Sequence, residues 1–278
     1  MTRVPVRYAT LAYGEDPAVY AQATMLMVSL LAYAPEPREL VVMTDRPKRF
    51  QWIRDAVRIH AVTASQLQSW TGPLPFSMRQ KLAAAASLLC ADGPLVFLDA
   101  DVVASGPLND LVEGVRAGRR YMHKREFELG SSTRKGNLCL WRELEHRQFG
   151  SFQFRPSDAM WNSGVLAIPA GDEPLLRDAL SLYDSMASAG IRHFATEQLV
   201  VGALLERAGR LHEARQWFTH YWGNKANFTR EIDRRLECVR GRLTPEVAAS
   251  EYGLDPITLP AEVRFDRIEK LKRWLRHR

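Results

Sequence analysis

Two aspartates one residue apart, Asp99 and Asp101, are the strongest chemical signal in the sequence. They directly follow the apolar run 94–98, which predicts a buried strand, and ligands of open α/β sheets bind at the carboxyl ends of strands. Two carboxylates this close repel each other unless a cation neutralises them, and a hard divalent cation is the natural partner of such oxygen ligands. The pair therefore predicts a metal site, against the alternative of a helix cap or a solvated loop.

A second class of enzyme also places two aspartates after an apolar strand. Phosphatases of the haloacid-dehalogenase type use the pair as nucleophile and general acid, and they usually continue the motif as DxDxT or DxDGT. Here Val103 stands where those motifs have threonine, and 98 residues precede the pair, which in those enzymes lies near the start of the chain. The phosphatase is therefore the weaker alternative.

The elements that position the pair alternate between strands and helices. The expected strands are 6–13, 39–44, about 57–62, 94–98 and 162–168. The expected helices run from an Asp16 cap and Pro17 to Ala34, from a Ser77 cap to Leu89, over 173–188 and 196–208, and from Thr244 to Gly253. This alternation, with several strands apolar throughout, predicts an α/β fold with a mostly parallel central sheet.

The composition is ordinary for a soluble globular protein. The chain has 278 residues, of which 46% are apolar and 25% charged, and such a composition argues against intrinsic disorder. We find no apolar run long enough for a membrane span and no signal-peptide pattern. Three widely separated cysteines exclude a disulfide scaffold and a CxxC-type zinc site, and they are typical of a reducing cytosol. We therefore expect a cytoplasmic protein.

Six short blocks, in this order, resemble the GT-A glycosyltransferases, and most closely the retaining family 8 enzymes, which include glycogenin. The blocks are Thr10–Gly14, Lys81, Asp99–Asp101, 162–166 (Asn-Ser-Gly-Val-Leu), 196–198 (Thr-Glu-Gln) and 220–225 (His-Tyr-Trp-Gly-Asn-Lys). They cover roughly residues 5–230. The resemblance implies a Rossmann-like GT-A fold and the transfer of a hexose from a nucleotide-sugar, with retention of the anomeric configuration.

The resemblance also implies a role for each matching residue. The metal ligands would be Asp99, Asp101 and His220. The residues in contact with the donor nucleotide and sugar would be Thr10, Ala12, Tyr13, Lys81, Asn162, Gly223 and Lys225. The catalytic residues would be Glu197 and Gln198, on the face of the sugar opposite the leaving group.

The chemistry of the side chains agrees with these roles. A divalent metal stabilises the negative charge that a nucleoside diphosphate carries as it leaves, and a mixed oxygen and nitrogen ligand set suits Mn²⁺ better than Ca²⁺. We therefore expect Mn²⁺, with Mg²⁺ as the alternative. Gly223 would let the backbone approach the phosphates, and Lys225 would place a positive charge on them.

Most of these residues also have a plain structural interpretation. Glu197 could simply follow a Thr196 helix cap, Asn162 could be a turn residue, and Lys81 and Lys225 could be solvated surface lysines. Two features depart from the family pattern: Lys225 follows the histidine by five residues instead of six, and a glutamate replaces the aspartate before Gln198. For the acidic residue that the family often places after the aspartate pair, the candidates are Glu126 and Glu128.

Residues 119–158 are polar, aromatic and irregular, which predicts a long binding loop. Sugars stack on the apolar faces of aromatic rings, so the aromatic residues in and next to this segment would shape the acceptor site, unless they belong to the core. These residues are Trp141, Phe152, Phe154 and Trp161.

The C-terminal residues 263–278 hold seven basic and two acidic side chains, out of a net charge of +6 for the whole chain. Their apolar residues Phe265, Ile268, Leu271 and Leu275 recur at helical spacing. Such a helix can lie on an anionic membrane surface, where each base contributes about 1 kcal/mol. The alternative is a helix docked on the body of the protein. Nothing else in the sequence favours a nucleic-acid partner.

The sequence therefore predicts a GT-A catalytic domain over 1–240 and a helical extension with a basic tail over 241–278. We expect a metal-dependent hexosyltransferase that uses a nucleotide-sugar, UDP-linked in our prediction, and a carbohydrate or lipid-linked acceptor. We expect it in the cytoplasm, with attachment to the inner face of the membrane through 263–278. The alternatives are the phosphatase and a non-catalytic, membrane-associated GT-A module.

Overall fold

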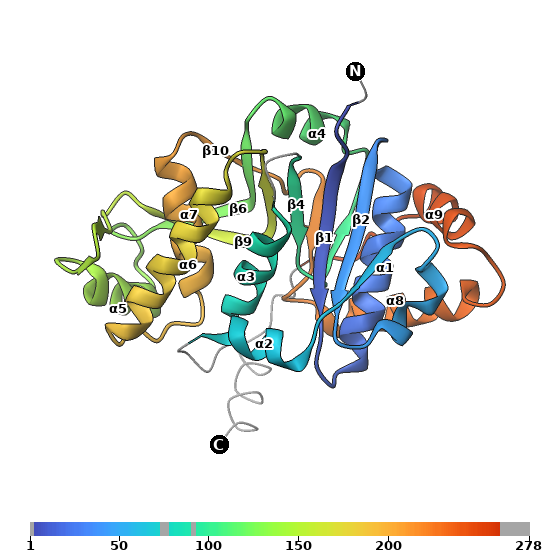
Figure 1. Ribbon diagram of the computed structural model, residues 1–278, viewed down its shortest axis with the longest axis horizontal. Coiled ribbons are helices and arrows are strands. Elements are labelled where there is room, and N and C mark those ends of the chain that lie inside the picture. The colour runs from blue at the N-terminus through green and yellow to red at the C-terminus, as the bar shows by residue number, and fades with distance from the viewer. Residues whose placement is uncertain (1–2, 73–77, 90–92, 262–278) are drawn as a thin grey trace.

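The computed structural model describes residues 3–72, 78–89 and 93–261. Within these ranges, the strands of the main sheet are β1 (Val6–Ala12), β2 (Arg38–Thr44), β3 (Arg58–Ala61), β4 (Leu95–Leu98), β6 (Arg120–Glu128), β9 (Ala159–Ile168) and β10 (Leu211–Glu213). Their order across the sheet is β10-β6-β9-β4-β1-β2-β3, and Figure 1 shows them between two groups of helices. Two small ribbons complete the strands: β5 (Val102–Ala104) with β11 (Phe218–His220), and β7 (Gln148–Phe149) with β8 (Phe152–Gln153).

The sheet is mostly parallel, as predicted. Strand β1 is parallel to β2 and β4, β2 to β3, and β10 to β6, whereas β9 is antiparallel to both of its neighbours. Leu98, the last residue of β4, pairs with Val165 of β9, and the Asp99 N–H donates to the Gly164 carbonyl at 2.9 Å. This register sets the aspartate pair beside the Asn-Ser-Gly segment of β9.

Three of the described helices, α1, α2 and α9, begin at a side-chain cap. They are α1 (Pro17–Tyr33), the 3₁₀ segment η1 (Pro47–Ile53), α2 (Ala64–Thr71), α3 (Met78–Leu88), α4 (Asn109–Arg116), α5 (Lys135–Leu144), α6 (Glu173–Ser188), α7 (Thr196–Arg207), α8 (Lys225–Val239) and α9 (Pro245–Leu254). The Asp16 side chain accepts from Ala18 N–H before the N1 proline of α1, and Thr244 accepts from Val247 N–H at α9. Such caps satisfy backbone donors that a helix start leaves unpaired.

Each face of the sheet has its own apolar core. Helices α3, α6 and α7 cover one face, where they pack on side chains such as Ala9 and Met43. Helices α1 and α4 cover the other face, where they pack on Tyr8 and Val42. Helices α8 and α9 then pack on the outer side of α1, as Figure 1 shows at the right of the sheet. Helix α1 is buried from Tyr20 to Leu30 because protein covers it on both sides.

The structure corrects the interpretation of residues 119–158 as a long loop. This segment contains β6, a strand inside the main sheet, together with α5 and the β7–β8 ribbon. The aromatic residues assigned to an acceptor site also belong to the core: Phe154 and Trp161 are buried, and Trp141 and Phe152 pack against the same apolar cluster. Large aromatic side chains contribute much of the area buried in a core, and their presence in a polar segment does not place them at a surface.

Two expectations fall on parts of the chain that the structure does not describe. The proposed Ser77 cap and the basic tail 263–278 lie outside the described residues. Helix α8 is present, although no helix was expected over its residues. Among the described residues, no helix is both long enough and apolar enough to cross a membrane.

Candidate functional site

A cleft of about 1080 Å³ opens at the ends of β1 and β4. Its walls come from the turn after β4, from β9, and from the first residues of helices α3, α7 and α8. The residues predicted for the site that line it are Tyr13, Lys81, Asp99, Asp101, Asn162, Glu197, Gln198, His220 and Lys225. Residues that lie far apart in the sequence therefore meet in one cavity.

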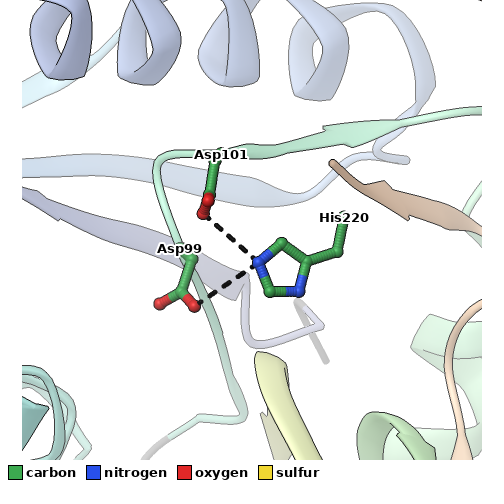
Figure 2. Close-up of side chains that lie close together, drawn as sticks. All are labelled: Asp99, Asp101 and His220. Atoms are coloured by element: carbon green, nitrogen blue, oxygen red, sulfur yellow. Dashed lines mark ion pairs between the residues drawn. The ribbon is translucent and has the colours of Figure 1, made fainter. Parts of the chain in front are cut away.

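The two aspartates converge with His220, as Figure 2 shows. The chain turns between β4 and β5, which brings both carboxylates to the same side although alternate residues of a strand point apart. Strand β5 pairs with β11, with His220 opposite Val102. As a result His220 Nε2 lies 3.3 Å from Asp101 Oδ1 and 3.9 Å from Asp99 Oδ2.

These three side chains fit a divalent metal. One ligand atom from each of them lies within 4.8 Å of the others. Two carboxylate oxygens and one imidazole nitrogen are ligands that Mn²⁺ accepts, and their number leaves coordination positions for a substrate's oxygens. Among the described residues, Asp99, Asp101 and His220 form the group of His, Cys, Asp or Glu side chains whose ligand atoms lie close enough together to hold such an ion.

Asp101 is buried and its charge is neutralised by two partners. Burial raises the pKa of its carboxyl, but the hydrogen bond and charge of His220 and the charge of Lys225 outweigh burial and hold that pKa well below its usual range. Lys225 Nζ lies 2.8 Å from Asp101 Oδ2. Lys225 is the first residue of α8, so a helix N-terminus, which favours anions, lies beside the cleft.

Asp99 is neutralised from the opposite side by Lys81. Lys81 Nζ lies 2.8 Å from Asp99 Oδ1 and donates to the Ser163 carbonyl at 2.5 Å and to Ser163 Oγ at 3.0 Å. Burial lowers the pKa of this lysine, but the charges of Asp99 and Glu197 outweigh that effect and raise its pKa above the ordinary value. Lys81 is therefore a charged, fixed side chain of the cleft floor.

Glu197 is a buried carboxylate at the start of α7. It accepts a hydrogen bond from Ser163 Oγ at 2.9 Å through Oε2, while Oε1 has no partner among the described residues. Burial is the largest effect on this group and raises its pKa, despite the opposing charge of Lys81. Its neighbour Gln198 lines the cleft beside it. A buried polar atom without a partner in the protein is a position where a ligand's hydroxyl group can bind.

Three predicted residues do not line the cleft. Thr10 and Ala12 are fully buried; their strand alternates sides, and Ala12 packs in the core beneath α1. Leu11 and Tyr13, one position along, face the cleft instead. Gly223 does not line the cleft, whereas Trp222 does. Of the first block, the residues whose side chains line the cleft are therefore 11 and 13, and not 10 and 12.

Other residues of the cleft were not singled out by the sequence. Ser163 stands inside the 162–166 block, and its contacts with Lys81 and Glu197 follow from the alternation of β9. Phe194 and Trp222 line the cleft with 68% and 54% of their surfaces exposed, which makes them the aromatic candidates for acceptor contact. Of the two weak acidic candidates, Glu126 lies in the cleft, whereas Glu128 forms an ion pair with Arg125.

Comparison with known proteins identifies the fold. No protein-family model and no curated protein sequence matches the chain. Among solved structures, mouse xyloside xylosyltransferase 1 in its apo form matches with a TM-score of 0.50 and 14% identity, over 76% of this chain and 85% of that chain. The galactosyltransferase LgtC, solved with donor and acceptor sugar analogues, matches with a TM-score of 0.47 and 12% identity, over 70% and 69% of the two chains. The chain has the GT-A fold.

Proposed function

We propose that this protein is a metal-dependent glycosyltransferase that moves a hexose from a nucleotide-sugar, UDP-linked in our proposal, to a glycan or lipid-linked acceptor. The observation that carries the proposal is the convergence of Asp99, Asp101 and His220 in the cleft of a GT-A fold. Fold alone does not define an activity, so the argument rests on what these side chains can bind.

The donor diphosphate fits the end of the cleft at β5, β11 and α8. Asp99, Asp101 and His220 would hold the Mn²⁺ or Mg²⁺ ion, and a bound divalent ion supplies charge stabilisation to the diphosphate leaving group. Lys225 is half exposed and ion-paired with Asp101, so it is placed to contact the diphosphate oxygens from the start of α8.

The donor sugar fits between β9 and the start of α7. Glu197 and Gln198 would face the anomeric carbon from the side opposite the leaving group, and Ser163 and Lys81 hold Glu197 in place. We propose retention of configuration on the family 8 resemblance, and NMR of the product's anomeric proton tests it directly.

The role of the C-terminal tail and the location of the protein in the cell are also proposals. We propose that 263–278 binds an anionic membrane surface at the cytoplasmic face, close to a lipid-linked acceptor. The division between 1–240 and 241–278 is likewise a prediction; α9, from the second segment, packs on α1 of the first.

A donor screen tests the function. Purified protein is melted with UDP, GDP, CDP and their sugars, each with Mn²⁺ and with EDTA. A ligand present at 100 times its dissociation constant stabilises the folded state by about 2.7 kcal/mol. We expect a metal-dependent shift with one nucleotide, followed by metal-dependent turnover of the matching sugar. If no nucleotide shifts the melt under either condition, the donor site is wrong, and the non-catalytic module becomes the better explanation. Release of inorganic phosphate from a phosphomonoester would instead support the phosphatase, against which the GT-A fold argues.

A further inference from the structure

Asn162 lies at the centre of a hydrogen-bond network behind the metal site. Its Oδ1 accepts from the backbone N–H of Gly164 at 3.0 Å and lies 2.9 Å from His220 Nδ1. Its Nδ2 donates to Glu126 Oε1 at 3.3 Å. Asn162 and His220 are both buried, so the contact between them is shielded from competition with water, whereas Glu126 is exposed.

The network determines which nitrogen of His220 carries the proton. A backbone N–H can only donate and an ionised carboxylate can only accept, so Gly164 and Glu126 together fix the orientation of the Asn162 amide. Asn162 Oδ1 is therefore the acceptor, and His220 Nδ1 must be the donor. In the neutral ring the lone pair then lies on Nε2, the nitrogen that faces Asp99 and Asp101.

The backbone of β9 holds the same ring in place sterically. A Cβ atom added to Gly164 would lie 2.3 Å from His220 Nδ1 and 2.6 Å from its Cε1, so the imidazole occupies the space that a side chain at 164 would fill. The ring of His123 also packs against His220 in an edge-to-face arrangement, with a centroid distance of 5.4 Å and an interplanar angle of 87°. The position of the ring and the protonation of its Nδ1 are both set before any ligand arrives.

The alternation of β9 divides the Asn-Ser-Gly segment into two functions. Ser163 points to Lys81 and Glu197, on the sugar side of the cleft. Asn162 and Gly164, one residue to either side, face His220. Adjacent residues of a strand point to opposite faces, so one short segment supports the sugar side and the metal side at once.

We propose that Asn162, supported by Glu126 and Gly164, is a positioning residue that presets His220 Nε2 as a metal ligand. The inference rests on the metal site of the proposed function and assigns Asn162 a role other than contact with the donor sugar. Partners that orient a ligating histidine typically change metal affinity by about 10- to 100-fold when they are removed.

Metal binding without nucleotide separates the two roles. We expect Asn162→Ala to weaken Mn²⁺ binding by about 10- to 100-fold in calorimetry with no donor present. Asn137→Ala is the matched control, because Asn137 lines the same cleft but bonds to Ser132, and it should bind Mn²⁺ like the wild type. In the double variant Asn162→Asp with Glu126→Gln, a carboxylate oxygen still accepts from His220 while the glutamine amide donates to the new aspartate, so metal binding should be retained.

Two results would overturn the inference. One is an Asn162→Ala variant that binds Mn²⁺ as tightly as the wild type while its KM for the donor rises, since Asn162 would then act on the sugar alone. The other is a double variant that loses as much affinity as Asn162→Ala.

A spectroscopic measurement keeps the inference testable if Asn162→Ala folds poorly or if the wild type binds no metal. Long-range ¹H–¹⁵N spectra of metal-free protein report which nitrogens of His220 are protonated, with His220→Asn used for assignment. We expect a protonated Nδ1 in the wild type and in the double variant. A ring that carries its proton on Nε2 alone in the wild type overturns the inference. Failure of the wild type to bind Mn²⁺ contradicts the metal site of the proposed function, while this spectrum still decides the role of Asn162.

Discussion

The two aspartates of the metal site are neutralised in opposite ways. Asp101 is the more buried carboxylate, yet its lysine partner Lys225 has a side chain that is 56% exposed. Asp99 is the more exposed carboxylate, yet its partner Lys81 is only 12% exposed. Lys81 also uses its other donors on Ser163, whereas Lys225 has Asp101 as its ion-pair partner among the described residues.

This difference indicates two kinds of lysine. A cation with three protein partners in a buried position is part of the framework, because moving it would leave several polar groups unpaired. An exposed cation with one ion pair can leave that pair at little cost. We therefore expect Lys81 to stay in place when ligands bind and Lys225 to exchange Asp101 for the donor's phosphates. The predictions below test that contrast.

The largest effect is expected for Asp101→Asn. The change removes a metal ligand and the negative charge that His220 and Lys225 share. Because metal stabilisation of a leaving group contributes several kcal/mol, we expect donor turnover to fall by at least about 100-fold, with Mn²⁺ binding lost in calorimetry. Asp55→Asn, at an exposed position, serves as the control. Unchanged turnover would remove Asp101 from the metal site.

Substitution of the two lysines should have different effects on the stability of the protein. Lys81→Met leaves a partly buried Asp99 without its ion pair, which we expect to cost about 3–5 kcal/mol of unfolding free energy in EDTA. Lys225→Met should change stability by less than about 1 kcal/mol but should raise the dissociation constant for the nucleoside diphosphate. Urea unfolding in EDTA measures the first effect and titration with nucleotide the second.

Added Mn²⁺ sharpens this comparison. A bound cation supplies the charge that Asp99 loses in Lys81→Met, so metal should restore part of that variant's stability. Equal losses of stability in the two lysine variants would show that both lysines play the same role, and the contrast drawn above would fail.

Ser163→Ala should affect the sugar side alone. It removes the donor to Glu197 Oε2 and leaves a buried carboxylate without its hydrogen bond, which costs about 1–3 kcal/mol. We expect a higher KM for the nucleotide-sugar with unchanged Mn²⁺ affinity. Ser87→Ala is the control, because the Ser87 hydroxyl bonds to its own helix at Ala84. A loss of metal affinity in Ser163→Ala would show that the two sides of β9 are not separate.

The smallest effect is a change in the pH dependence of stability. Burial raises the pKa of Glu197 in the folded state, so the folded protein holds a proton that the unfolded chain releases between the ordinary glutamate pKa and the raised value. Stability from this group is therefore present below that window and is lost as the pH rises through it. Glu197→Gln should remove this loss, so its unfolding free energy in EDTA should exceed that of the wild type near neutral pH. Parallel curves for the two proteins would contradict the raised pKa.

Local sequence predicted those parts of the fold and site that depend on neighbouring residues. The apolar run before Asp99 marked β4, and the Asp16-Pro17 and Thr244-Pro245 caps marked the starts of α1 and α9. The meeting of His220 with the aspartates depends on the pairing of β5 with β11, and only the resemblance of motif order pointed to it.

The differences between the predicted and the observed structure also have physical causes. Strand β6 carries charged residues such as Arg125 because its second half forms a partly exposed wall of the cleft, so its composition resembles a loop. Helix α8 is highly charged and buries a single stripe, Phe228, Ile232 and Leu236. These residues recur at intervals of four, so the helical pattern is present in the sequence but rests on three apolar positions. The family resemblance placed Thr10 and Ala12 at the donor, but their side chains face away from the cleft because alternate residues of β1 point to opposite sides of the sheet.

All ten residues of β9 are buried, and this has a consequence for hydrogen exchange. Amides that a central strand donates to its neighbours exchange slowly, because the strand must leave the sheet, whereas helix ends open locally at much lower free energy. We expect the end of β9 that pairs with β4, Val165–Ile168, to be among the slowest parts of the chain to take up deuterium and the first turns of α3, α7 and α8 to exchange faster. Strand β9 would then keep its position when a ligand binds, whereas the first turns of α3, α7 and α8 could adjust. Protection from exchange gained on adding nucleotide would be seen in these helix starts and not in β9.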